Sequence, residues 1–417
     1  MKQTVLFLEP KGTILEVIRS AGIQGYNIVV FTSDENLFRN APLPYRTANQ
    51  YINLIIHIPS WSDEKFIHEK INELSSFLFI SGIYYGLDVC VGIGATLRKQ
   101  FGLNAPSRKT MDLVINKVEL RKLLRDKKLS NVKFFTNYQA NSFEHWPLEK
   151  YGYFKPVRGA GSAYVKKCEN LEEFKRARDY WLKGDDTDPS YIKQHVEALK
   201  EYFLEESVEG ELLSVEAISD RGNFKVLGLL SRILYSNDST VEMGSCFPYL
   251  HPLSKEIVEF VKKVHEVVGF DNGPSHTELI ISPKGKIEVI DFNPRFVGAD
   301  VLQSINFAYE TKIENVLLDF ALGKKIDIPN SLKNFSCLQY LLLPNIYEFE
   351  SIDFPEDLFI KFSTSYIEPF TKIKSRERQS DYAGCYLTVT SSFQESLDYS
   401  RNLREKILIN KNYKGVF

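Results

Sequence analysis

The 417-residue chain has few of the features that mark secreted, membrane or metal-scaffold proteins. Its five cysteines are scattered and form no CxxC pair, so neither a structural zinc site nor a disulfide framework is expected. We expect these cysteines to fill the core in a reducing compartment. No apolar run approaches the roughly 20 residues that span a bilayer, and the early TVLFL run is too short for a secretion signal. A cytoplasmic protein without membrane contact is expected.

Several common functional signatures are also missing. The chain has 52 Lys and Arg against 54 Asp and Glu, so no broad basic surface for nucleic acid is expected. The turn after the first strand lacks GxGxxG, and GxxxxGK[ST] is absent, which disfavours a dinucleotide fingerprint and a P-loop. His251, His265 and His276 do not share metal-ligand spacing, and no Ser/His/Asp or Cys/His arrangement is visible.

What is present is an ordinary globular composition, with 43% hydrophobic and 25% charged residues, on a chain long enough for two or three domains. TVLFLEP reads as a strand, ILEVIRSAG as a helix and NIVVFT as a second strand. Strand, helix and strand within about thirty residues predict a parallel βαβ unit. The N-terminal region therefore looks like a small Rossmann-like domain.

The stretch DNGPSHTELIISPKGKIEVIDFNPRFVGAD, residues 271–300, carries the most informative pattern. Two apolar segments flank a Pro-Lys-Gly turn and predict a β-hairpin. Glu278 lies on its first strand, and Asp291 and Asn293 share one face of its second strand. Three oxygen ligands with few carboxylates suit Mg²⁺, and Arg295 could hold a phosphate or carboxylate. An ordinary surface hairpin is the alternative.

Two upstream segments could hold phosphate. A helix expected over 110–127 carries Lys117, and Lys155 closes a strand before the glycine-rich RGAGSA loop and a second strand, AYVKKC. The amides of Gly159, Gly161 and Ser162 could fold over phosphate oxygens, because glycine permits close approach. A solvated lysine and a flexible hairpin turn are the alternatives.

The strand YFLEESV ends in acidic residues and can offer backbone groups to an adenine edge. Glu205 or Glu211 could reach the amino group or the ribose, although solvated carboxylates are the better explanation of this segment in isolation. Helices are then expected at KEIVEFVKKVHEVV, VLQSINFAYE and IENVLLDFALG. A C-terminal α+β region of about ninety residues follows.

In this order, Lys117, FKPVRGAGSAYV, FLEESVEGELLSVE and HTELIISPKGKIEVIDFNPRFVGAD resemble the ATP-grasp superfamily of carboxylate–amine ligases. The last motif looks most like the bacterial L-amino-acid ligase branch, which makes dipeptides. The resemblance implies an α/β and α+β multidomain protein. A Rossmann-like domain (1–110) would precede the ATP-grasp domain (111–327, with a lid at about 117–200 and a C-lobe at about 201–327) and a C-terminal α+β subdomain (328–417).

The resemblance also implies roles for individual residues. Glu278, Asp291 and Asn293 would bind the metal, although the family commonly has Glu where this chain has Asp291. Arg295 would be catalytic, steadying the acyl phosphate, and His276, Arg295 and Asp300 would lie near the substrate. The nucleotide would be held by Lys117, Lys155, Gly159, Gly161, Ser162, Glu205, Glu206, Ser207, Val208 and Glu211.

The implied reaction uses ATP and Mg²⁺, with Mn²⁺ as a substitute. ATP would phosphorylate a carboxylate, an amine would attack the acyl phosphate, and ADP and phosphate would leave. The partners would be small-molecule substrates, with no nucleic acid or membrane, and a homodimer is compatible with the family. The alternatives are an ATP-grasp ligase of a purine-type or peptide-tailoring pathway and a catalytically silent nucleotide-binding module.

Overall fold

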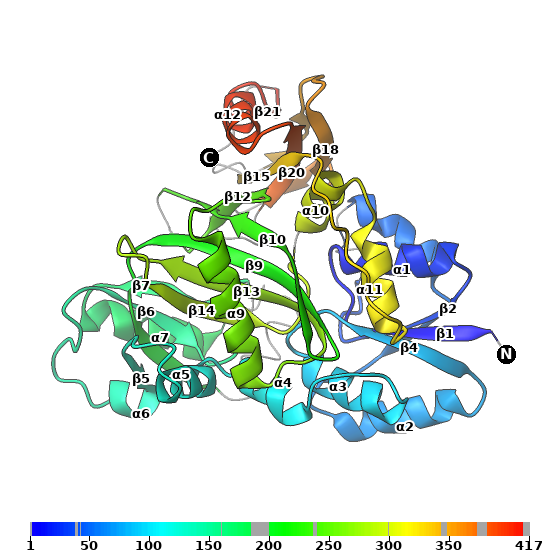
Figure 1. The fold of residues 1–417 in the computed structure, drawn as a ribbon, viewed down its shortest axis with the longest axis horizontal. Coiled ribbons are helices and arrows are strands. Elements are labelled where there is room, and N and C mark those ends of the chain that lie inside the picture. Colours follow the sequence, from blue (N-terminus) through cyan, green and yellow to red (C-terminus); the bar gives the residue numbers. More distant parts are fainter. Residues whose placement is uncertain are drawn as a thin grey trace.

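The computed structural model describes residues 2–37, 41, 43–159, 161–184, 200–236, 240–298, 300–342, 348–372 and 382–411. The chain folds around four larger sheets, which Figure 1 shows as an N-terminal layer, a small outlying lobe, a central twisted sheet and a C-terminal lobe. The polar sequence KGDDTDPS predicts a loop at 183–190, and most of this stretch lies outside the described residues.

The N-terminal region forms a parallel sheet, as the βαβ pattern predicted. The strand order is β3-β2-β1-β4, so β2 and β3 lie on one side of β1 and β4 lies on the other. In parallel sheets, ligands commonly bind at such a switch point, beside the carboxyl ends of the two strands. The elements are β1 (Gln3–Leu8), α1 (Ile14–Ile23), β2 (Asn27–Thr32), η1 (Leu43–Tyr51), β3 (Leu54–His57), α2 (Glu64–Ser75), β4 (Phe79–Tyr85) and α3 (Val91–Gln100).

The single helix predicted over 110–127 is wrong: two helices, α4 (Arg108–Val114) and α5 (Lys117–Asp126), occupy that stretch. The Asn116 side chain accepts a hydrogen bond from the backbone N–H of Glu119 at 3.0 Å and so caps α5. Asn116 has an extended backbone, which interrupts the helix. Lys117 therefore lies on the first turn of α5 rather than within a long solvated helix.

The outlying lobe contains an antiparallel sheet with strand order β5-β8-β6-β7 and a small core of its own. The strand expected at AYVKKC is shorter than predicted, because regular pairing begins only at Lys166. The elements are β5 (Phe134–Thr136), α6 (Asn137–Ala140), β6 (Gly152–Pro156), β7 (Lys166–Cys168), α7 (Leu171–Lys183) and β8 (Tyr202–Glu206).

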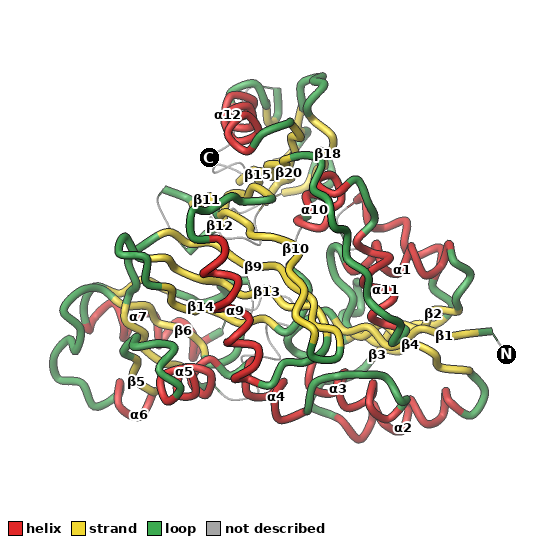
Figure 2. The backbone as a smooth tube through the Cα atoms, viewed as in Figure 1, coloured by secondary structure: helices red, strands yellow, loops and turns green. Residues whose placement is uncertain are grey.

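The central sheet has the order β10-β9-β13-β14 and contains the predicted hairpin. The helix α9 packs beside this sheet (Figure 2). It ends at Gly269, which adopts a left-handed φ of 74°. The elements are β9 (Glu211–Asp220), β10 (Asn223–Ser231), α9 (Ser254–Val268), β13 (Gly273–Ile281), β14 (Ile287–Asn293), α10 (Val301–Tyr309) and α11 (Ile313–Ala321).

The C-terminal sheet has the order β11-β12-β15-β20-β18, so it joins two strands from the middle of the chain to three from its end. The predicted boundary at 328 therefore falls inside the sequence span of one continuous sheet. The elements are β11 (Ile233–Leu234), β12 (Glu242–Phe247), β15 (Phe335–Leu342), β16 (Glu348–Phe349), β17 (Ile352–Asp353), β18 (Ile360–Ser365), β19 (Thr371–Lys372), β20 (Tyr382–Thr390), α12 (Phe393–Arg404) and β21 (Leu408–Ile409).

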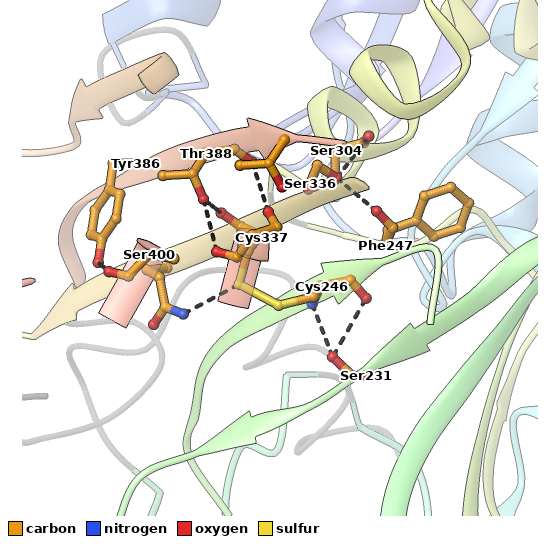
Figure 3. Close-up of a disulfide and its surroundings, with 12 residues drawn as sticks. Ser231, Cys246, Phe247, Ser304, Ser336, Cys337, Tyr386, Thr388 and Ser400 are labelled. Carbon is orange, nitrogen blue, oxygen red and sulfur yellow. Dashed lines mark hydrogen bonds between the residues drawn. A yellow bond between two sulfur atoms is a disulfide. The ribbon is translucent and has the colours of Figure 1, made fainter. Parts of the chain in front are cut away.

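A disulfide joins Cys246 on β12 to Cys337 on β15, as Figure 3 shows. The expectation that all the cysteines are unpaired is therefore wrong for these two. They stand directly opposite each other in the antiparallel register, a proximity that their separation of 91 residues conceals. Cys90, Cys168 and Cys385 are free and buried, as core filling predicts.

One hydrophobic core runs from the parallel sheet to the central sheet and α10–α11 without interruption. The N-terminal and central sheets are therefore bound to each other by buried apolar surface. Among the described helices, none is long and apolar enough to cross a membrane.

Buried His265 on α9 gives a testable pH dependence of stability. Burial lowers the pKa of His265 to about 3, and its ring nitrogens lie 3.2 Å from Ser219 Oγ and 3.1 Å from Ser275 Oγ. Between pH 6.5 and 3 the unfolded chain therefore binds a proton that the folded chain does not. Because of this group, we expect the free energy of unfolding to fall by about 1.4 kcal/mol for each pH unit below 6.5.

Urea unfolding at pH 7.5 and 5.5 checks this expectation. The decrease in the free energy of unfolding from pH 7.5 to pH 5.5 should be smaller in His265→Gln than in the wild type. It should equal the wild-type decrease in His145→Gln, because His145 is exposed. Equal losses in all three proteins would contradict it.

Candidate active site

A cavity of about 430 Å³ opens where the N-terminal, outlying and central sheets meet. Its walls come from the β1–α1 turn, the loop after β4, the loop after β6, the end of β8, and the β13–β14 hairpin. Thirteen of the predicted site residues line it: Lys117, Lys155, Gly159, Gly161, Ser162, Glu205, Glu206, Val208, His276, Glu278, Asp291, Asn293 and Arg295.

The β13–β14 hairpin forms as predicted and sets the register of the polar residues. Glu278 pairs with Asp291, and His276 pairs with Asn293. Residues directly opposite in an antiparallel pair point to the same face, so these four side chains form two adjacent rows. Gly285, with φ 76°, permits the tight turn between the strands.

Each of the three expected metal ligands has one oxygen that accepts a hydrogen bond from a basic side chain. Asp291 Oδ2 accepts from Lys117 Nζ at 2.5 Å, and Glu278 Oε1 accepts from Arg232 at 3.0 Å. Asn293 Oδ1 accepts from Arg295 at 3.4 Å. Two carboxylates and one amide fit Mg²⁺, which takes few carboxylates and completes its shell with water and phosphate.

Within the described ranges, no group of three or more His, Cys, Asp and Glu is arranged to hold a metal ion. The hairpin offers the amide of Asn293 as a third protein ligand beside Glu278 and Asp291.

Arg232 joins the hairpin to β12. Its guanidinium lies 2.8 Å from His276 Nε2, donates to Glu278 at 3.0 Å and forms an ion pair with Glu242. Burial disfavours the charged imidazole of His276, but Glu216, 2.6 Å from its Nδ1, and Glu278 outweigh burial and raise its pKa to about 9. Burial likewise opposes ionisation of Glu278, yet His276 and Arg232 hold its pKa well below the usual range. The cluster is thus a network of charged groups.

The Glu205 side chain has a different task from the expected adenine contact. It is 2% exposed and forms ion pairs with Arg121 and Lys155. Burial would raise its pKa, but these two cations lower it to about 2. The carboxylate therefore fixes the Lys155 ammonium at the cavity wall.

The glycine-rich loop lies over the cavity. Gly161 has φ 62° and Ser162 has φ 52°, so the chain turns sharply there. Ser207 and Glu211 do not line the cavity. The Glu211 carboxylate instead accepts a hydrogen bond from the Tyr249 hydroxyl, outside the cavity, which does not support a ribose contact.

Asp300 is also outside the cavity lining, contrary to the expected place near the substrate. It is 2% exposed, and its two oxygens accept hydrogen bonds from the hydroxyls of Tyr45 and Tyr366. Burial raises the pKa of Asp300 although these hydroxyls oppose the shift. Asp300 therefore ties η1 and the segment after β18 to the start of α10.

Sequence reasoning missed the residues that contact the predicted site residues or line the cavity beside them. Glu216 on β9 stands opposite His276 on β13. Asp88, in the loop after β4, forms an ion pair with Arg295. Register and tertiary packing bring these pairs together, and neither leaves a local motif. The missed set is Lys11, Gly12, Thr13, Asp88, Arg121, Glu216, Arg232 and Glu242.

Residues 153–303 match the ATP-grasp domain family, and this span contains the loop, β8 and the hairpin. Over this span the chain is similar to ATP-grasp domains. It has the ATP-grasp fold, with mixed α/β content over several sheets, as the resemblance implied.

Known proteins agree with this fold. The chain is 23% identical over 294 residues to the alanine–anticapsin ligase of Bacillus amyloliquefaciens, covering 64% of this chain and 60% of that protein. It thus spans about 60% of that relative's length. The L-amino acid ligase of Bacillus licheniformis has a TM-score of 0.81 at 18% identity, covering 98% of both chains.

A biotin carboxylase domain from Hydrogenobacter thermophilus, solved with MgADP, ADP and bicarbonate, has a TM-score of 0.70 at 16% identity. That likeness covers 100% of this chain and 92% of the other. These likenesses concern the arrangement of the ATP-grasp domain and its flanking regions.

Replacing Arg232 tests the ion pairs that this residue forms with Glu242 and Glu278 at the cavity wall. Its side chain is 5% exposed, so Arg232→Met leaves Glu242 and Glu278 without their shared cation. We expect the free energy of unfolding to fall by about 3–5 kcal/mol. Arg19→Met, at a surface ion pair with Glu16, should change it by under about 1 kcal/mol. Urea unfolding that shows equal effects would contradict this account.

Proposed function

We propose that this protein is an ATP- and Mg²⁺-dependent ligase that joins a carboxylate to an amine through an acyl phosphate, releasing ADP and phosphate. The observation that carries the proposal is one cavity that contains two lysines, the glycine-rich loop and the hairpin oxygens. The match of residues 153–303 to the ATP-grasp domain supports the nucleotide assignment. The MgADP in the biotin carboxylase domain supports the cofactor.

The residues have separate tasks in this proposal. Lys117, Lys155 and the amides of the 159–162 loop would neutralise the phosphates, and Arg295 would steady the transferring phosphoryl group. Glu278, Asp291 and Asn293 would hold Mg²⁺, which supplies Lewis acidity and orients the phosphates when bound.

The loop after β6 would act as a cover for the reaction. It lines the cavity with Gly159, Gly161 and Ser162, and hairpin residues line the same cavity. Closure over the nucleotide would exclude water, which otherwise hydrolyses an acyl phosphate before the amine attacks.

An amino acid is the substrate class that we propose. Alanine–anticapsin ligase and L-amino acid ligase are the names of two relatives. The cavity mixes fixed charges of both signs, which suits a substrate that carries a carboxylate and an ammonium group. Phosphate release measured with amino acids, singly and in pairs, tests this class.

Removing hairpin oxygens should stop turnover. We expect Glu278→Gln and Asn293→Ala to lower ADP release at least about a hundredfold, because the transferring phosphoryl charge loses its metal. The control is Glu288→Gln on the same hairpin, whose buried carboxylate lies outside the cavity lining. Thermal unfolding verifies that all three variants fold. Unchanged ADP release from both site variants would refute the metal assignment.

Removing the Lys155 ammonium should weaken nucleotide binding. A charged hydrogen bond contributes about 1.5–3 kcal/mol, so Lys155→Ala should lower ATP affinity about tenfold to a hundredfold. Lys167→Ala, an exposed lysine on the adjacent β7 strand, should leave it unchanged. Calorimetry with a non-hydrolysable ATP analogue measures both. Equal affinities for the two variants would count against the phosphate role.

A further inference from the structure

The loop after β4 carries the buried carboxylate of Asp88, which forms an ion pair with Arg295, just after the β13–β14 hairpin. Arg295 Nε lies 3.2 Å from Asp88 Oδ1 and 3.1 Å from Asp88 Oδ2. The two side chains are 11% and 5% exposed. The residues are 207 positions apart, so this ion pair connects the parallel N-terminal sheet to the ATP-grasp domain.

Close packing restrains the loop that carries Asp88. A Cβ on Gly86 would lie 1.8 Å from Ile14 Cδ1, so this loop approaches α1 more closely than a side chain would allow. The backbone N–H of Cys90 donates to the Leu87 carbonyl at 3.0 Å, and the Cys90 thiol donates to the same carbonyl at 3.2 Å. The Asp88 carboxylate therefore stands at a defined position.

The other nitrogens of the Arg295 guanidinium also have partners. One amino group donates to the Phe296 carbonyl at 3.1 Å, and the other to Asn293 Oδ1 at 3.4 Å. The planar group thus lies between the N-terminal loop and the hairpin ligand Asn293. Among these partners Asp88 is the only one that carries charge, so it contributes most to the orientation.

We propose that Asp88 is a positioning residue that orients Arg295 toward the transferring phosphoryl group, so that the N-terminal sheet takes part in forming the active site. This inference rests on the proposed ligase function for the role of Arg295. A displacement of about 1 Å in a reacting geometry can cost about a hundredfold in rate. Loss of the Asp88 charge should therefore lower kcat without removing the nucleotide site.

The test compares Asp88→Asn with the full-length wild type in amino-acid-dependent ADP release. We expect kcat to fall about a hundredfold, while the affinity for a non-hydrolysable ATP analogue stays within about twofold. The matched control is Asp220→Asn, which also removes a buried aspartate, here paired with Lys225 at 3.6 Å outside the cavity. It should lose stability with little change in kcat.

A double-mutant cycle separates positioning from general damage. In an Arg295→Lys background, which lacks the planar fork, Asp88→Asn should change kcat by less than about twofold, because its target is already gone. A fall in that background as large as in the wild type would overturn the proposal. So would an unchanged kcat for Asp88→Asn alone.

A readout without turnover keeps the two proposals distinguishable. The Arg295 Nε–H signal in nitrogen-15 NMR, identified by its loss in Arg295→Lys, should exchange faster with water in Asp88→Asn and not in Asp220→Asn. If the wild type releases no ADP with any amino acid, the ligase proposal fails, and this exchange rate alone decides whether Asp88 orients Arg295. An unaltered rate would refute that orientation.

Discussion

The register of one antiparallel hairpin is the constraint on which the candidate active site depends. With Glu278 opposite Asp291 and His276 opposite Asn293, two rows of oxygen and imidazole groups face one cavity. A shift by a single residue would turn these side chains to the other face of the sheet. The register is held on the far side of β13 as well, where Glu216 on β9 stands opposite His276.

Charge compensation is the second consequence of this register. Lys117 and Lys155 form ion pairs with Asp291 and Glu205, and in the proposed function phosphates would take over part of that pairing. Such buried carboxylates stabilise cations that would otherwise be expensive to place at a cavity wall. In the proposed function, these pairs from different regions of the chain would preorganise the cavity for a polyanion.

Local patterns were enough to predict much of this molecule. The 3.6-residue period and the glycine stop predicted α9, and the Pro-Lys-Gly turn between apolar runs predicted β13 and β14. The cap at Asn116 divided the expected helix because a local side-chain hydrogen bond prevailed over the apolar pattern. The Asp88–Arg295 pair and the Cys246–Cys337 disulfide escaped prediction, because only tertiary packing brings their members together.

Transfer of a carboxylate oxygen to phosphate is the most direct test of the proposed chemistry. The protein, ATP and Mg²⁺ would be incubated with an oxygen-18-labelled amino acid carboxylate and an amine, and the released phosphate analysed by phosphorus NMR. An acyl phosphate broken by amine attack leaves one labelled oxygen in inorganic phosphate beside ADP. Label in AMP, or phosphate released without label, would contradict the account.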